Sequence, residues 1–416
     1  MIKKVYVEGP FLTQSGYGEH ARYVLRALRT RSDVDLYAHP LNWGATSWQA
    51  ENTEERNWLD SVIRKTIETQ TRNQDMSFDY HVFVGLPHEF VRKAPQAVCV
   101  TAGIETTKVS QEWIKKTYEI NKIIVPSEHA ANGFRNTEYI VANEERPNQP
   151  YILSCNTQID VIPYPVKQVD PCESFDLDLE FDFNFLAVCT LIPRKNLHSL
   201  LLWFLEEFKD DEVGLVLKVG RGRNSNMDFE ATRSFLDRVL RERSKTKCKV
   251  YLLHGDLTEE EMTSLYTRSD IKCLLTTSHG EGYGLPLFEA SYLGLPIVSP
   301  DWGGQLDFLY GDIVSKGKTK KKALFGKVDY DIRHVAEDAV WEPLIVKDSM
   351  WCFPREQSFK NRIRDVYKNY GMYKSWAKKL KEQNILKFSE QDLLEKLSLA
   401  LVGQKVNTSL NVQTFD

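Results

Sequence analysis

Short apolar runs alternate with helical stretches along most of this chain, and the alternation restarts midway. Predicted strands occupy 4–7, 80–84, 97–101 and 122–125 in the first part, and 183–189, 214–220, 249–253, 270–276 and 296–299 in the second. Helical periodicity lies between them, as in Tyr17–Leu28 and Leu197–Phe208. Such alternation favours parallel sheets with helices on both faces. We therefore expect an α/β protein with two doubly wound domains and a cleft between them.

The domain boundary is predicted from a break in this pattern. The chain has 416 residues, which is long for one core. An extended, proline-bearing segment at 160–166 is followed by VDPCESFDLDLEFDF, which is acidic and has no helical period. We expect an N-terminal domain at 1–167, a linker at 168–182 and a C-terminal domain at 183–370. Residues 371–416 should form helices that pack back towards the N-terminal domain, ending in a loose tail.

Composition excludes several classes of protein. The net charge of -4 gives no global footprint for nucleic acid. The seven cysteines are scattered without a CxxC pair, which is typical of reduced thiols in the cytoplasm. No apolar stretch approaches the ~20 residues of a membrane span. The aspartates of DLDLEFDF lie in the linker, so we predict no metal site there.

The segment Ser278–Leu309 carries the most chemical information. It follows a buried strand and opens a helix, and its glycines at 280, 282 and 284 allow the backbone to approach a ligand. Pro286 suits the first turn of that helix. The free amides of Gly284 and Leu285 then form an anion site suited to a phosphate, reinforced by the helix dipole.

Two carboxylates, Glu281 and Glu289, bracket this turn with seven residues between them. The stretch EGYGLPLFEASYLGLPI resembles the glutamate–seven–glutamate motif of retaining, family 4-type glycosyltransferases of GT-B fold, written EGFGLPxxEAxAxGxPV. The resemblance implies two Rossmann-like domains and transfer of a hexosyl or pentosyl group from a nucleotide-sugar, most simply a UDP-sugar, without metal or other cofactor. It places Glu281 at the reacting sugar as a catalytic residue, Gly282 and Tyr283 on the donor sugar, and Glu289 on the donor ribose.

A basic pair in LIPRKNL fits the same resemblance. Lys195 matches the family's lysine, whereas the family's arginine position falls on Thr190. We assign Arg194 as the replacement. A diphosphate leaving group requires such cations because negative charge develops on it as the sugar departs.

Two loops of the N-terminal domain complete the predicted site. The glycines of SGYG allow the backbone to approach a phosphate or sugar, and the resemblance implies that Gly16 and Gly18 face the donor diphosphate. The loop Thr101–Thr107 lacks the histidine that family members often carry, and Glu105 is the nearest catalytic candidate. Glu105 either orients the acceptor hydroxyl or caps a helix beginning at Thr106 or Thr107.

Three further features have open meanings. Asp307 stands where the family more often has glutamate, and His254–Leu257 resembles the place where the donor's base binds. The lysine-rich run Ser315–Lys322 reads as a solvated loop or as a contact with an anionic acceptor.

The acceptor is the least constrained prediction. The segments EGPFLTQSGYGEHARYVLRAL and GIETTKVSQEW resemble glycosyltransferases of tailed bacteriophages, which implies duplex DNA with a hydroxymethylated base, reached by base flipping and contacted by the Lys316–Lys322 loop. A polysaccharide or small-molecule acceptor is an equal alternative. Thr190 and the missing histidine instead favour a non-catalytic module that binds a sugar-nucleotide or carbohydrate.

Overall fold

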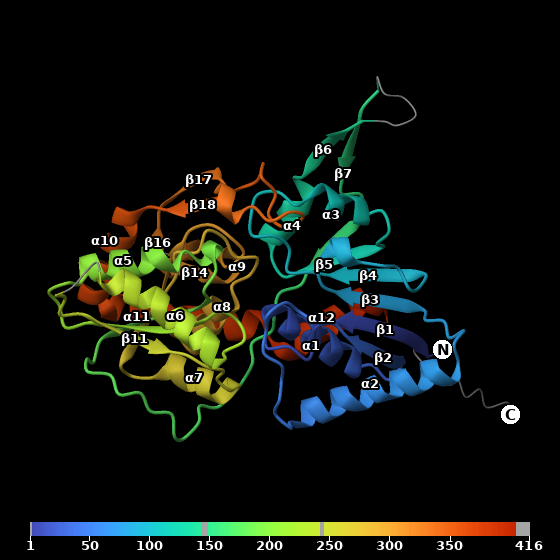
Figure 1. The fold of residues 1–416 in the computed structure, drawn as a ribbon, viewed down its shortest axis with the longest axis horizontal. Coiled ribbons are helices and arrows are strands. Elements are labelled where there is room, and N and C mark those ends of the chain that lie inside the picture. The colour runs from blue at the N-terminus through green and yellow to red at the C-terminus, as the bar shows by residue number, and fades with distance from the viewer. Residues whose placement is uncertain (1, 143–148, 242–244, 316, 405–416) are drawn as a thin grey trace.

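The computed structural model describes residues 2–142, 149–241, 245–315 and 317–404, which form two α/β halves side by side (Figure 1). The N-terminal half holds a six-stranded sheet of order β2-β1-β3-β4-β5-β8, parallel throughout. Its strands are β1 (Lys3–Gly9), β2 (Val34–Pro40), β3 (Tyr80–Val84), β4 (Gln96–Val100), β5 (Lys122–Val125) and β8 (Gln158–Val161).

The C-terminal half repeats this architecture. Its six-stranded parallel sheet has the order β11-β10-β9-β12-β13-β16. The strands are β9 (Asn184–Thr190), β10 (Gly214–Gly220), β11 (Lys249–Leu253), β12 (Ile271–Leu275), β13 (Ile297–Pro300) and β16 (Gly326–Val328). The order reverses between β9 and β12, and ligands of doubly wound sheets bind at such a switch point.

Helices surround both sheets. They are α1 (Gly16–Arg29), α2 (Glu54–Arg72), α3 (Gln111–Lys116), α4 (Glu128–Arg135), α5 (Leu197–Glu207), α6 (Asn226–Arg241), α7 (Glu259–Thr267), α8 (Leu285–Leu293), α9 (Leu306–Leu309), α10 (Glu356–Lys368), α11 (Tyr370–Lys387) and α12 (Glu390–Val402). Three antiparallel hairpins are added at the surface: β6 (Glu138–Val141) with β7 (Tyr151–Ser154), β14 (Tyr310–Ser315) with β15 (Lys318–Ala323), and β17 (Tyr330–His334) with β18 (Met350–Pro354).

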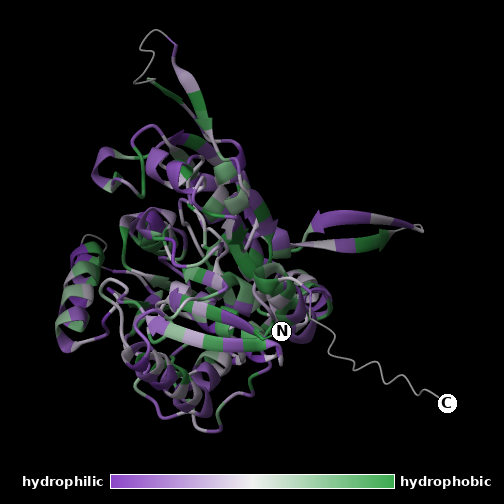
Figure 2. Cartoon of the chain, turned by 90° about the vertical axis from the view of Figure 1, so that its right-hand side faces the viewer, coloured by the Kyte–Doolittle hydropathy of each residue, from purple (hydrophilic) through white to green (hydrophobic). Residues whose placement is uncertain are grey.

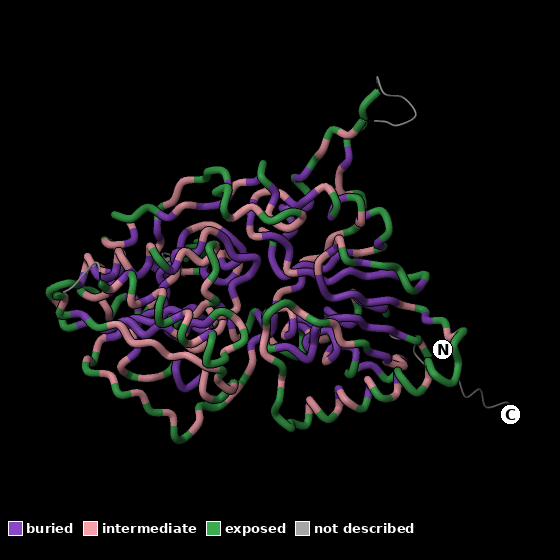
Figure 3. Tube along the Cα trace, in the orientation of Figure 1, coloured by how far each residue is buried: buried purple, intermediate pink, exposed green. Residues whose placement is uncertain are grey.

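Alternate residues of each strand face opposite layers of helices, as a strand's period of two requires. In β4, Val98 belongs to the core that contains α1 and α12, whereas Cys99 belongs to the core that contains α3 and α4. One apolar cluster is continuous across the two halves and includes Tyr164 and Tyr283. Figure 3 shows buried chain in both sheets and also where the halves meet.

The predicted class, with two doubly wound Rossmann-like halves, is confirmed. Residues 168–182 contain no helix or strand, and α12 packs on α1, where the Tyr23 hydroxyl donates to the Leu393 carbonyl at 3.1 Å. The domain boundaries themselves stay a prediction, and 405–416 of the predicted tail lie outside the described residues. Among the helices of the described ranges, none combines the length and hydrophobicity of a membrane span.

Two local predictions were wrong. The lysine run is mostly strand β15 rather than a loop, because it pairs along its length with β14; Lys316 itself lies outside the described residues. Figure 2 shows this hairpin projecting from the body of the protein. No helix begins at Thr106 or Thr107, because the next helix, α3, is capped by the Ser110 side chain, which accepts from the amide of Trp113.

Candidate functional site

The predicted donor residues of the C-terminal half lie at the switch point of its sheet. Lys195 ends a short 3₁₀ turn, Pro193–Lys195, just after β9, and the loop 276–284 follows β12. The amide of His279 donates to the Arg194 carbonyl at 2.8 Å, and the Thr277 hydroxyl donates to the Asn196 carbonyl at 2.9 Å. The two loops therefore form one unit at the carboxyl edge of β9 and β12.

Four charged side chains meet at this edge and form what we call the ionic cluster: Glu105, Arg194, Lys195 and Glu281. Lys195 Nζ lies 2.6 and 2.8 Å from the two carboxylate oxygens of Glu281. The Arg194 guanidinium lies 3.3 Å from Glu281 through Nη1 and 3.0 Å from Glu105 through Nη2. Since Glu105 follows β4, the cluster joins the two halves and brings both predicted catalytic carboxylates to one place.

The charge state of Glu281 follows from these contacts. Burial alone would raise the pKa of this carboxyl, but the neighbouring charges of Lys195 and Arg194 outweigh burial and lower the pKa to about 2. Burial alone would lower the pKa of Arg194, because it also disfavours the charged form of this group. The neighbouring charges of Glu105 and Glu281 outweigh burial, so the pKa of Arg194 is raised. Glu281 and Arg194 are therefore both ionised at neutral pH, and the carboxylates of the cluster occupy the cations that a diphosphate would need.

Two helices begin close to each other beside this cluster. Gly284 has a φ of 90° and stands before the first turn of α8, which contains Pro286. A Cβ placed on Gly16, the first residue of α1, would lie 3.8 Å from Leu285 Cδ1. The opening amides of a helix have no partner within it and attract anions. The starts of α1 and α8, each with such amides, thus lie close together at the junction.

Gly18 is required for the geometry of the turn at the start of α1. Its amide donates to the Ser15 Oγ at 2.9 Å, which is the N-cap bond of α1. A Cβ at this position would stand 2.1 Å from the Thr13 carbonyl oxygen, so the turn requires glycine. The amide of Gly16 is accordingly better placed for a phosphate than that of Gly18.

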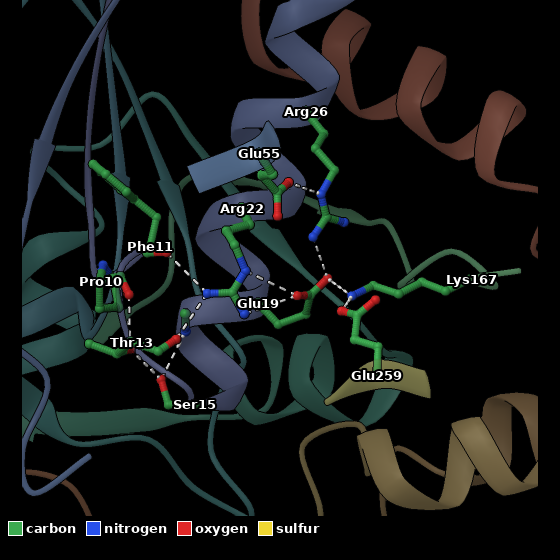
Figure 4. Close-up of polar contacts among 11 residues, drawn as sticks. Pro10, Phe11, Thr13, Ser15, Glu19, Arg22, Arg26, Glu55, Lys167 and Glu259 are labelled. Atoms are coloured by element: carbon green, nitrogen blue, oxygen red, sulfur yellow. Dashed lines mark hydrogen bonds and ion pairs between the residues drawn. The ribbon is translucent and has the colours of Figure 1, made fainter. Parts of the chain in front are cut away.

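A network of ion pairs ties this N-terminal turn to the C-terminal half (Figure 4). Arg22 Nη1 donates to the carbonyls of Phe11 and Thr13 at 3.0 and 2.9 Å. Arg22 also pairs with Glu19 at 3.1 Å, and Glu19 pairs with Lys167 at 2.9 Å. Lys167 in turn contacts Glu259 of α7. The position of the Gly16 turn is therefore fixed relative to the second half.

Glu289 lies further along α8 and is partly buried. The Tyr266 hydroxyl donates to its Oε2 at 2.9 Å. Burial raises the pKa of Glu289 to about 7, although the Tyr266 bond and the Lys167 charge act to lower it. A carboxyl held in this way, on the helix that begins at the predicted phosphate site, is suited to accept hydrogen bonds from a diol.

The loop glycines approach protein backbone in this structure. A Cβ on Gly280 would lie 2.0 Å from the Glu105 carbonyl oxygen, and one on Gly282 would lie 2.5 Å from that of Ala102. The Ser127 hydroxyl, at the N-cap of α4, donates to the Gly282 carbonyl at 2.5 Å. The halves are therefore in direct contact where the donor sugar was predicted.

Tyr283 was predicted to contact the donor sugar. Its side chain is buried against Tyr164, Phe288 and Phe308, with ring centroids 5.1 to 5.3 Å apart. Its hydroxyl is buried and makes no hydrogen bond to any residue that the structure describes. The Tyr283 side chain therefore belongs to the apolar cluster between the halves.

The structure also places Thr190, Asp307 and His254, whose roles the sequence left open. Thr190 is the exposed last residue of β9, four positions before the arginine that reaches the cluster. Asp307 accepts a hydrogen bond from the amide of Glu128 at 2.9 Å, so it contacts the start of α4 in the other half. His254 follows β11, with Nε2 3.8 Å from Asp228.

Comparisons with known proteins place this geometry in context. A scan against models of known protein families finds no match. The serotype-specific mannosyltransferase WbdA of Escherichia coli is 31% identical over 118 residues, which are 28% of this chain and 13% of WbdA. A sucrose-phosphate synthase from Thermosynechococcus elongatus superposes with a TM-score of 0.62 at 13% identity, over 96% of this chain and 98% of that one. HepE from Anabaena, solved in complex with UDP and glucose, gives 0.57 at 11% identity, over 97% of this chain and all (100%) of that one.

The chain has the GT-B fold. At these identities the solved structures establish the fold alone. In this GT-B protein, sequence reasoning missed Ser127, Tyr266 and Lys167, which position the predicted donor residues. Ser127 carries a usable signal, since it follows the predicted strand 122–125 after only Pro126 and serine is a typical N-cap. Within the described ranges, no group of three or more His, Cys, Asp and Glu side chains is arranged to hold a metal ion.

Proposed function

We propose that this protein is a glycosyltransferase that moves a sugar from a nucleotide-sugar to an acceptor hydroxyl with retention of anomeric configuration. One observation carries the proposal. Arg194, Lys195 and the first turns of α1 and α8 converge at the switch point of the C-terminal sheet. A nucleoside diphosphate is the ligand class that such a convergence of cations and free amides fits.

The roles of the residues follow from their positions. Lys195, Arg194 and the amides of Gly284, Leu285 and Gly16 neutralise the diphosphate as it leaves, so this protein's own cations supply the charge without a metal ion. Glu289 grips the ribose diol. Gly282 and the backbone of Tyr283 lie along the sugar.

The reaction breaks the bond between the anomeric carbon and the diphosphate oxygen and forms one to the acceptor oxygen on the same face. The departing phosphate takes the acceptor's proton. Glu281 stabilises positive charge on the anomeric carbon, because its carboxylate is ionised at neutral pH. Glu105 stands on the acceptor side of the cluster. Donor entry must displace Glu281 from the cations, and the contact between the halves excludes water once the donor is in place.

UDP is the nucleotide to test first, because the similar fold of HepE was solved with UDP and glucose. For the acceptor, the match to a serotype-specific mannosyltransferase supports a saccharide. The exposed lysines of β15 support the second candidate, duplex DNA carrying a hydroxymethylated base, since a two-stranded ribbon fits the major groove.

Thermal melting against UDP, GDP, ADP, CDP and dTDP tests the donor site. A ligand at 100 times its dissociation constant adds about 2.7 kcal/mol of stability. We expect a shift with one nucleotide that is lost in Glu289→Ala and Lys195→Ala. The absence of any shift would remove the donor site and leave a carbohydrate-binding module without turnover. Transfer assays with saccharides and with hydroxymethylated and plain duplex DNA then separate the two acceptors.

A further inference from the structure

The Arg194 guanidinium is held from three sides. Nη1 donates to the Gly280 carbonyl at 2.6 Å and contacts Glu281 at 3.3 Å, and both of these groups belong to the loop after β12. Nη2 contacts Glu105 at 3.0 Å. Glu105 is thus the group that fixes the second nitrogen, and it does so from the other half of the protein.

Glu105 is itself held in place by backbone contact. Its carbonyl oxygen lies where a Cβ on Gly280 would come within 2.0 Å, so the two loops touch directly. This contact fixes the Glu105 backbone, from which the side chain extends, beside the 280–281 loop. The Glu105 side chain is 26% exposed and that of Glu281 is 9% exposed, so Glu105 is the more accessible of the two.

Lys195 needs no comparable support. Both of its contacts are with Glu281, and a flexible ammonium group can follow a moving anion. A planar guanidinium binds phosphate through two parallel N–H groups and must be oriented to do so. The three contacts of Arg194 leave further N–H groups of its five for an incoming phosphate.

We infer that Glu105 is a positioning residue, which holds the Arg194 guanidinium in the plane that binds the donor diphosphate. Its carboxylate neither receives the acceptor's proton nor contacts the sugar. The contact also couples the two halves, because the diphosphate site is complete only while the loop after β4 lies against the loop after β12. This inference rests on the proposed donor site.

The sign of one substitution separates this role from a simple charge effect. Glu105→Gln removes a negative charge beside the bound diphosphate, and electrostatics alone predicts tighter UDP binding. A positioning role predicts weaker binding, by about tenfold, because the guanidinium loses its second anchor. In an Arg194→Lys background the same substitution should have little further effect, since the group that it orients is gone.

The experiment measures UDP affinity by calorimetry for wild type, Glu105→Gln, Arg194→Lys and the double variant. Glu112→Gln is the control, because Glu112 pairs with Lys115 on the exposed surface of α3 in the same half. Melting temperatures check that each variant is folded. The inference is supported if Glu105→Gln lowers UDP affinity tenfold when Arg194 is present but not in the Arg194→Lys background.

Three results overturn the inference. The first is unchanged or tighter UDP binding by a folded Glu105→Gln variant, with or without a fall in turnover. The second is that Glu105→Gln lowers UDP affinity by the same factor in the Arg194→Lys background as in wild type. The third is wild-type protein that binds none of the five nucleotides; this result alone also removes the proposed function.

Discussion

Glu289 gives a prediction in which stability and function move in opposite directions. Its carboxyl is partly buried on α8 and accepts a hydrogen bond from Tyr266. Burial raises its pKa to about 7 from 4.5. The folded protein therefore binds a proton more tightly than the unfolded chain, and ionisation of Glu289 destabilises the fold as the pH rises from about 4.5 through 7.

The magnitude follows from that shift. Relative to a neutral residue, Glu289 costs roughly 1 kcal/mol of folding free energy at pH 5 and up to about 3 kcal/mol at pH 8. The upper value applies to full burial, and partial exposure reduces it. Glu289→Gln keeps the shape and can still accept the Tyr266 hydrogen bond. We expect this variant to be more stable than wild type at pH 8, with a smaller gain at pH 5, and to lose affinity for the donor nucleotide.

Urea unfolding at several pH values from 5 to 8 measures the stability difference, and calorimetry with UDP measures the affinity. Glu395→Gln on the exposed surface of α12 controls for the loss of one negative charge. The reasoning is refuted if Glu289→Gln is less stable than wild type at pH 8, or if its advantage does not grow with pH. Retained UDP affinity in a stabilised variant would separate Glu289 from the ribose.

Three other substitutions test the contacts around the site. Gly280→Ala places a Cβ 2.0 Å from the Glu105 carbonyl oxygen, so it should lower unfolding free energy by about 2 kcal/mol, whereas Gly371→Ala, with open space around it, should not lower the melting temperature. Lys195→Met leaves the buried Glu281 charge with less compensation and should lower the free energy of unfolding by about 3 kcal/mol in a urea titration. Because ion pairing lowers the pKa of the Glu281 carboxyl to about 2, this loss should be complete above pH 4.5 and should vanish towards pH 2. Ser127→Ala removes the α4 cap and the bond to the Gly282 loop, and should cost about 1 kcal/mol in the same assay.

The fold was largely predictable because each buried strand is a short apolar run. The segments 80–84, 122–125, 214–220 and 249–253 match β3, β5, β10 and β11 residue for residue. Helix α2 was missed because only Leu59, Val62 and Thr66 of its nineteen residues are buried, which leaves little periodicity to read. Strand β15 was missed because its lysines read as a charged loop, although long lysine stems are common on an exposed ribbon.

The sequence named candidate residues on both sides of the junction, but it placed them relative to one another only on the C-terminal side. The glycines, Pro286 and the two glutamates lie within a single strand–loop–helix unit, so local sequence places them together. The contacts that position them join residues far apart in the chain, such as Glu105 with Arg194 and Ser127 with Gly282. Local pattern carries no information on such pairs, which depend on how the two sheets pack.

The ionic cluster leaves the proposed donor site formally neutral before a donor enters. Two carboxylates and two cations balance formally, and all of them are largely shielded from solvent. An incoming diphosphate brings negative charge that this cluster cannot accept until Glu281 turns from Lys195 towards the positive anomeric centre. On the proposed function, the same carboxylate satisfies the cations without a donor and stabilises the sugar with one. Donor binding and preparation for transfer would then be a single exchange of ionic partners.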